Sequence, residues 1–132
     1  MKSYLIETSV IIDYLKGKDS AVTVINSLEG ELSSSYLCLA ELYEGIYRVT
    51  NKEMLEQSVQ TYFSSLTTIY GIDATVAQTF GKLRARLKKK GTIIQDIDLF
   101  LAATCVAYDL EMVTLNKKHF AHVEELKIYQ HN

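Results

Sequence analysis

Four acidic side chains and one amide stand where short apolar runs end or where helical segments begin. They are Glu7, Glu41, Asp96, Asp98 and Asn116. Carboxylates brought together from such positions repel one another and are costly to keep ionised without a cation. Mg²⁺ and Mn²⁺ prefer oxygen ligands, and either ion can activate a water molecule and offset charge that develops on a phosphodiester. If these side chains meet in space, they are suited to metal-dependent phosphodiester hydrolysis.

A purely structural role for the same residues remains open on spacing alone. Acidic residues at helix starts commonly cap the helix or interact favourably with its dipole. Asp96 can be read in both ways, because it can cap a helix that begins near residue 97 or contribute to a metal site. Spacing does not separate the two interpretations.

The elements that must position these side chains alternate between strands and helices. Short apolar runs predict strands, and apolar residues at helical spacing predict helices. The predicted strands cover residues 3–6, 31–35, 67–70, 112–115 and 127–129. The predicted helices cover residues 9–16, 19–29, 36–48, 51–65, 73–90 and 97–109, with a short one near His119. The expected N-caps are Thr8 or Ser9 for the first helix, Asp73 for the fifth and Asp96 for the sixth.

This alternation predicts an α/β fold with three layers, in which helices cover both faces of a central parallel sheet. Ligands of such sheets bind beyond the carboxyl ends of the strands. Glu7 and Asn116 directly follow predicted strands, and Glu41 lies about one turn into the helix after the second strand. The acidic side chains are therefore expected to meet at that edge.

Four segments carry the sequence motifs that bear on function. They are residues 4–17 (YLIETSVIIDYLKG), 39–45 (LAELYEG), 98–103 (DLFLAA) and 113–120 (VTLNKKHF). In order and spacing they resemble the motifs of VapC-type toxins, which are PIN-domain ribonucleases of type II toxin–antitoxin pairs. The resemblance covers nearly the whole chain and implies a single three-layer α/β/α PIN-like domain over residues 1–132.

The resemblance also implies roles for individual residues. The implied catalytic residues are Glu7, Glu41, Asp98 and Asn116. The implied ligands of Mg²⁺ or Mn²⁺ are Glu7, Asp98 and Asp96, and the implied supporting residues are Ser9 and Thr114.

Glu7 departs from the family pattern, because the first acid of these proteins is ordinarily Asp. One additional methylene moves the carboxylate by roughly an ångström, and Mg²⁺ requires a near-ideal octahedral arrangement of its ligands. We therefore expect this chain to bind metal less well, or to cleave more slowly, than a Glu7→Asp variant.

The implied activity is hydrolysis of phosphodiester bonds in structured RNA, such as transfer or ribosomal RNA, by a metal-activated water. The implied partners are a VapB-like antitoxin, in a hetero-oligomer, and a second copy of the chain, in a homodimer. The amphipathic helices of the first half would provide both contacts.

Two alternatives remain open: a DNA nuclease on the same fold, and an inactive protein that only binds its antitoxin. A phosphoacceptor receiver domain fits less well, because one acid rather than two follows the first strand.

The formal net charge of −2 requires any RNA contact to come from clustered basic residues. The dense basic run lies within residues 82–90, where a solvated helix end is an equally acceptable interpretation. The candidate RNA-binding residues are Lys16, Arg86 and Lys88.

The 132 residues are 48% hydrophobic and 23% charged, which is typical of one folded globular domain. No signal-peptide core or membrane-length apolar run is evident, so a cytoplasmic protein is expected. Cys38 and Cys105 lie in apolar segments and are expected to be buried thiols. His119, His122 and His131 lack an evident companion ligand, which disfavours a zinc site.

Overall fold

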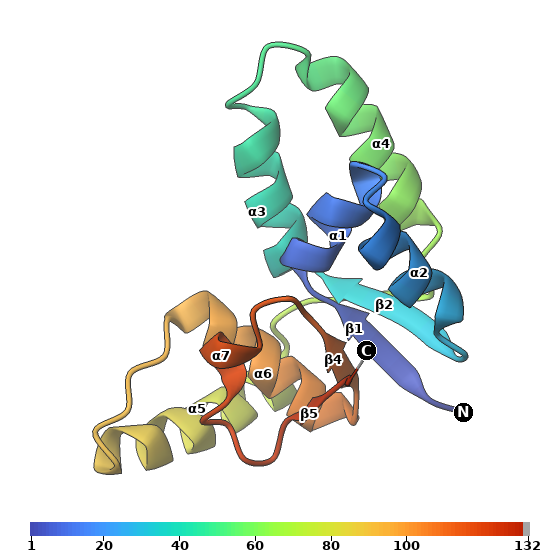
Figure 1. Cartoon of the computed structure of the whole chain (residues 1–132). Helices are drawn as coiled ribbons and strands as arrows, with labels where there is room; N and C mark the ends of the chain where they lie inside the picture. Colours follow the sequence, from blue (N-terminus) through green and yellow to red (C-terminus); the bar gives the residue numbers. More distant parts are fainter. Residues whose placement is uncertain (131–132) are drawn as a thin grey trace.

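Five short strands form one parallel sheet in the computed structural model of this protein (Figure 1). The strands are β1 (Ser3–Ile6), β2 (Glu31–Ser35), β3 (Thr68–Tyr70), β4 (Glu111–Val113) and β5 (Lys127–Ile128). Their order is β3-β2-β1-β4-β5, and every neighbouring pair is parallel. The structure describes residues 1–130, so His131 lies outside the described residues.

Helices flank the sheet, with α1 to α4 gathered on one side of it and α5 to α7 on the other (Figure 1). The helices are α1 (Thr8–Leu15), α2 (Asp19–Ser27), α3 (Tyr36–Ile46), α4 (Lys52–Ser64), α5 (Ala74–Lys89), α6 (Asp96–Tyr108) and α7 (Lys117–Phe120). The predicted α/β fold with a central parallel sheet is therefore confirmed. Across residues 1–130, none of these helices has the length and apolar character needed to cross a bilayer.

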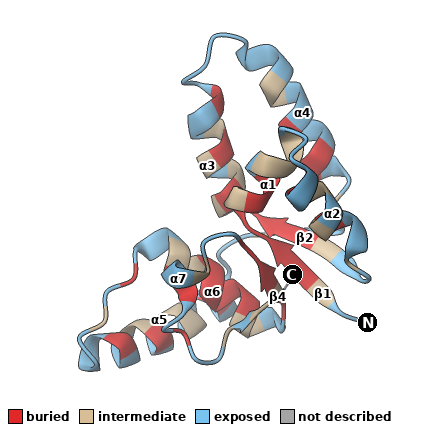
Figure 2. Ribbon diagram, viewed as in Figure 1, coloured by how far each residue is buried: buried red, intermediate tan, exposed pale blue. Residues whose placement is uncertain are grey.

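The central strand β1 is buried because helices cover the sheet on both faces. Leu5 and Ile6 are fully buried, as are Met112 and Val113 of the neighbouring strand β4. This burial explains why β1 reads as a continuous apolar run rather than an alternating one. Figure 2 shows buried residues concentrated in the sheet and along α6. Cys38 is buried as predicted, and its burial raises the pKa of the thiol to about 11; Cys105 is also buried, which raises its thiol pKa.

The predicted elements are all present, and their ends differ from prediction by at most two residues. The strand predicted over residues 112–115 ends at Val113, so Thr114 lies in the loop that follows it. The N-cap of α5 is Asp73, as predicted, and its side chain accepts a hydrogen bond from the backbone amide of Val76.

Two predicted caps are wrong. Helix α1 begins at Thr8 and Glu7 is its N-cap residue, while the Thr8 hydroxyl is directed to another helix. Helix α6 begins at Asp96, so Gln95 takes the N-cap position and makes no side-chain cap. In both cases a partner from a distant segment binds the side chain that local capping rules assigned to the helix start.

Gly30 directly precedes β2, where a side chain would collide with the backbone of Lys2, the residue before β1. Its φ is +154°, and a Cβ atom there would lie 2.2 Å from the backbone oxygen of Lys2. We expect Gly30→Ala to lower the free energy of unfolding by about 2 kcal/mol or more, measured by urea denaturation. Gly45→Ala is the control, because its Cβ would meet open space within α3. The control is expected to be neutral or slightly stabilising, and a Gly30→Ala protein as stable as the parent would contradict the prediction.

Candidate active site

Glu7 lies at the carboxyl end of the central strand, where parallel sheets place their ligands. The backbone hydrogen bonding between β1 and β4 extends to Glu7, because the Glu7 amide donates to the Val113 oxygen at 2.9 Å. The residue is only 4% exposed, and its Oε1 accepts hydrogen bonds from Ser9 Oγ at 2.5 Å and from Thr114 Oγ1 at 2.6 Å. Two hydroxyl donors thus hold a nearly buried carboxylate.

The same two hydroxyls fasten the loop after β4 to Glu7. Ser9 Oγ accepts from the backbone amide of Leu115 at 3.0 Å, and Thr114 Oγ1 accepts from the amide of Asn116 at 2.9 Å. The loop and the start of α1, which are more than 100 positions apart in sequence, therefore form one rigid edge around the carboxylate. The Asn116 side chain makes no hydrogen bond to any part of the chain between residues 1 and 130.

Glu41 projects from α3 toward the same edge. Thr8 Oγ1, on the first residue of α1, donates to Glu41 Oε1 at 2.6 Å. Burial raises the pKa of the Glu41 carboxyl; the Thr8 hydrogen bond opposes that shift, and the negative charges of Glu7 and Asp98 add to it. Glu7 and Asp98 therefore lie near enough to Glu41 for their negative charges to raise the pKa of its carboxyl.

Asp98 lies in the first turn of α6 and is partly buried. Its Oδ2 is 3.3 Å from Nδ1 of His119 on α7. Sequence reasoning missed Thr8 and His119 as site contacts, although both stand within motifs that resemble those of the family. Their neighbours in sequence gave no sign of which acid each would meet.

Asp96 is not brought to the acidic group. Its carboxylate is 81% exposed and lies 2.6 Å from the guanidinium of Arg84 on α5. The charges that raise the pKa of Glu41 include Asp98 but not Asp96. The structure thus shows Asp96 in a surface ion pair between two helices.

The candidate RNA-binding residues lie in different surroundings. Lys16 lines a 270 Å³ cavity together with Glu41 and has no ion-pair partner within residues 1–130. Arg86 forms an ion pair with Glu125, and Lys88 is exposed near the end of α5. Of these three candidates, only Lys16 lines a cavity together with one of the acids, Glu41.

A sequence model of the PIN domain matches residues 4–126 of the chain. The chain belongs to the PIN domain family. The match spans all seven helices, strands β2 to β4 and all of β1 but its first residue, and it includes Glu7, Glu41 and Asp98.

Individual relatives of this PIN domain are VapC-type proteins, so the resemblance inferred from the four motifs is confirmed. "Ribonuclease VapC1" of Methanocaldococcus jannaschii is 35% identical over 127 residues, covering 95% of this chain and 85% of the relative. "Ribonuclease VapC" of Rickettsia bellii is 30% identical, covering 94% and 92%. A crystal structure of VapBC2 from Rickettsia felis, bound to a DNA fragment from their promoter, aligns with a TM-score of 0.88 and 27% identity over 98% of this chain and 99% of that one. DNA-bound VapBC from Salmonella typhimurium aligns with a TM-score of 0.88 and 25% identity over 98% of each chain.

The acidic edge of this PIN domain has the donor chemistry that Mg²⁺ or Mn²⁺ requires. Among residues 1–130, no three His, Cys, Asp or Glu side chains are grouped so that they could hold a metal ion by themselves. Mg²⁺ does not need three, because it is commonly held by one or two carboxylates and keeps several waters. The carboxylate of Glu7 is nearly buried without an ion-pair partner in the described chain, and the pKa of Glu41 is raised partly by its acidic neighbours. A hydrated divalent ion would compensate the charge of the Glu7 carboxylate and reduce the repulsion among the acidic side chains near Glu41.

Proposed function

We propose that this PIN domain is a Mg²⁺- or Mn²⁺-dependent endoribonuclease, the toxin of a VapBC-type toxin–antitoxin pair, formed as one domain by residues 1–132. The observation that carries the proposal is that Glu7, at the carboxyl end of β1, is followed by Thr8, whose hydroxyl donates to Glu41 of α3 at 2.6 Å, while the charges of Glu7 and of Asp98 on α6 both help to raise the pKa of Glu41. The ribonuclease names of its relatives support RNA as the substrate class. Acting on structured cellular RNA such as transfer or ribosomal RNA, it would work in the cytoplasm.

In this proposal Glu7 and Asp98 bind the ion, and Glu41 and Asn116 complete the site directly or through waters. When bound, the divalent ion supplies Lewis-acid chemistry that activates water and offsets charge on the phosphodiester. The Thr8 hydroxyl orients the Glu41 carboxylate from 2.6 Å away. Ser9 and Thr114 orient Glu7, and they keep the loop that carries Asn116 against it.

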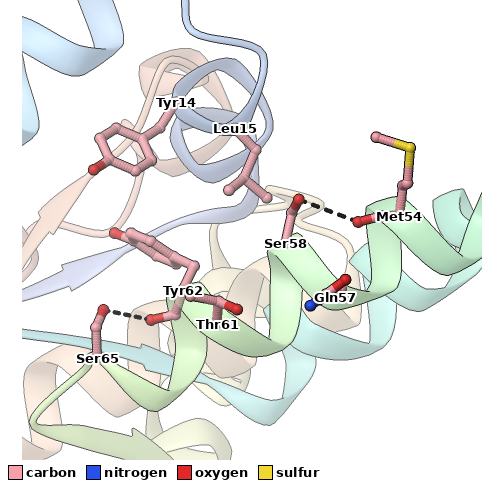
Figure 3. Close-up of a pocket in the computed structure, with 8 residues that line it drawn as sticks. All are labelled: Tyr14, Leu15, Met54, Gln57, Ser58, Thr61, Tyr62 and Ser65. Atoms are coloured by element: carbon pink, nitrogen blue, oxygen red, sulfur yellow. Dashed lines mark hydrogen bonds between the residues drawn. The ribbon is translucent and has the colours of Figure 1, made fainter.

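The proposed antitoxin contact is a cavity between α1 and α4 (Figure 3). Its volume is 590 Å³, and its lining combines Tyr14 and Leu15 of α1 with Met54 and Tyr62 of α4. The Tyr62 hydroxyl is buried and has no hydrogen-bond partner within residues 1–130. A peptide segment of a VapB-like partner would bury the apolar lining and supply that hydrogen bond. The VapBC complexes among the structural neighbours support such a hetero-oligomer.

A homodimer is also part of the proposal. Tyr36 and Tyr47, at the two ends of α3, are 57% and 66% exposed. Large exposed aromatic side chains on one helix are typical of protein contacts, since they bury much apolar area at low entropic cost.

Removal of divalent metal is the direct test of the activity. The purified chain is expected to fragment total cellular RNA in Mg²⁺ or Mn²⁺ and to lose at least about 95% of that activity in EDTA, because a carboxylate group without its cation repels the phosphodiester. Initial rates are read from labelled RNA on denaturing gels, with single- and double-stranded DNA in parallel.

Each rival function has a distinct outcome in the same assay. Equal cleavage of DNA would favour the DNA nuclease. Absence of cleavage by both the parent chain and a Glu7→Asp variant, with antitoxin binding retained, would favour the inactive binding protein. RNA cleavage that persists in EDTA would contradict the metal requirement.

A further inference from the structure

A polar cavity of 360 Å³ opens beside Asp98, between the loop that precedes α6 and the α7 segment. We call it the α7 pocket. Its wall includes Gln95 and Asp98 on one side and Lys118, His119 and His122 on the other. It therefore shares Asp98 with the proposed catalytic edge and presents three basic side chains, those of Lys118, His119 and His122.

The basic residues of this pocket are free of carboxylate partners, with one exception. Lys118 and His122 have no ion-pair partner within the part of the chain that the structure describes. His119 is the exception, since it lies 3.3 Å from Asp98. An unpaired ammonium group is available to bind an anion from solution without first breaking a contact.

The basic run on α5 is different, because much of its charge is already matched. The ion pairs there are Arg84 with Asp96, Arg86 with Glu125 and Lys90 with Glu124. An RNA phosphate would have to compete with these carboxylates. Lys82, Lys88 and Lys89 of the run have no ion-pair partner among the described residues, but Lys118 lines a cavity together with Asp98, and this position favours α7 over α5 for the phosphate contact.

A phosphodiester that approaches three carboxylates needs nearby positive charge, since phosphates and carboxylates repel one another. Lys118 and His122 provide nitrogen donors at the border of that acidic edge, and Gln95 adds an amide that can bond to a ribose hydroxyl. Ile93, which is 91% exposed at the mouth of the pocket, offers an apolar surface to a sugar or base. The combination fits one nucleotide of a single strand.

We propose that the α7 pocket is the substrate subsite for the nucleotide next to the cleaved bond, and that Lys118 and His122 contact its phosphate. The inference rests on the proposed ribonuclease function and identifies where the strand leaves the acidic edge. Its contacts require no bound metal, so it is testable by binding alone.

The test measures binding of a fluorescein-labelled 12-nucleotide oligouridylate by fluorescence anisotropy in EDTA, over a range of KCl concentrations. Lys118→Ala is expected to weaken binding about fivefold at low salt and to reduce the slope of log K against log salt by about 0.7, the contribution of one phosphate contact in a single strand. His122→Ala is expected to weaken binding about threefold. Lys89→Ala, which removes an exposed and unpaired lysine of α5, is the control and should change binding less than twofold.

Equal affinities and slopes for Lys118→Ala and Lys89→Ala would overturn the inference, and so would loss of antitoxin binding by Lys118→Ala with unchanged RNA binding. Lys118 is exposed and makes no contact that folding requires, so both variants should retain the parent circular dichroism spectrum. If the parent chain cleaves total RNA in Mg²⁺ while Lys118→Ala binds RNA normally, the subsite proposal is contradicted and the proposed ribonuclease function is not. If no variant binds or cleaves RNA, the proposed function fails with it.

Discussion

Asp98→Asn is expected to slow metal-dependent RNA cleavage by at least about 100-fold, because the substitution keeps the size of the side chain and removes its charge. A carboxylate that binds a divalent ion stabilises it by several kcal/mol, and each 1.36 kcal/mol corresponds to about tenfold in rate. The fold should be unaffected, since Asp98 is partly exposed in the first turn of α6 and its charge adds to the repulsion that raises the pKa of Glu41. The measurement is the initial rate of RNA cleavage in Mg²⁺ and in Mn²⁺, with stability checked by urea denaturation.

Asp96→Asn is the matched control for that experiment. Asp96 lies two positions earlier on the same helix, but its carboxylate is ion-paired with Arg84. The Asp96 carboxylate is 81% exposed and Arg84 also donates to the backbone oxygen of Ile94, so this variant should cleave RNA within about twofold of the parent and remain folded. A rate for Asp98→Asn within tenfold of the parent, or an equally large loss for Asp96→Asn, would contradict the assignment.

Glu7→Asp is expected to accelerate RNA cleavage by roughly tenfold and to lower the Mg²⁺ concentration needed for half-maximal rate. Misplacement of a reacting or ligating group by about an ångström can cost up to 100-fold in rate, and Mg²⁺ tolerates little departure from octahedral geometry. In the structure Oε1 of Glu7 is held by the Ser9 and Thr114 hydroxyls, so the longer side chain is fixed rather than free to adapt. A shorter acid should release part of this contact, at a cost of about 1 kcal/mol in stability.

Glu44→Asp makes the same one-carbon deletion on an exposed residue of α3 whose charge also reaches Glu41. It should leave both the rate and the Mg²⁺ dependence unchanged. A gain confined to Glu7→Asp would therefore trace to the position of its carboxylate rather than to a general change in charge or length. Equal rates for the parent and Glu7→Asp would show that the longer side chain is harmless here.

The order of the elements was predictable from sequence because it depends on local pattern, whereas the acids of the candidate site were named through the resemblance of the four motifs. Three such local signals are the apolar run of β1, the helical spacing in α3 and the Asp73 cap of α5. Each signal is carried by residues that are close to one another in sequence. Parallel strands then place residues that follow them at one edge, and so Glu7 and the loop of Asn116 could be expected to meet. The buried state of Cys38 follows from the same periodicity.

Tertiary packing alone decided which side chain each polar group would meet. Thr8 bonds to Glu41, Asp96 to Arg84 and Asp98 to His119, and in each pair the partners lie on different helices. Local rules assigned Thr8 and Asp96 to caps, because the free backbone amides of the first helical turn are the nearest hydrogen-bond donors along the chain. Once helices pack at fixed positions around the sheet, a group from a distant segment comes nearer still, and the hydrogen bond or ion pair forms there instead.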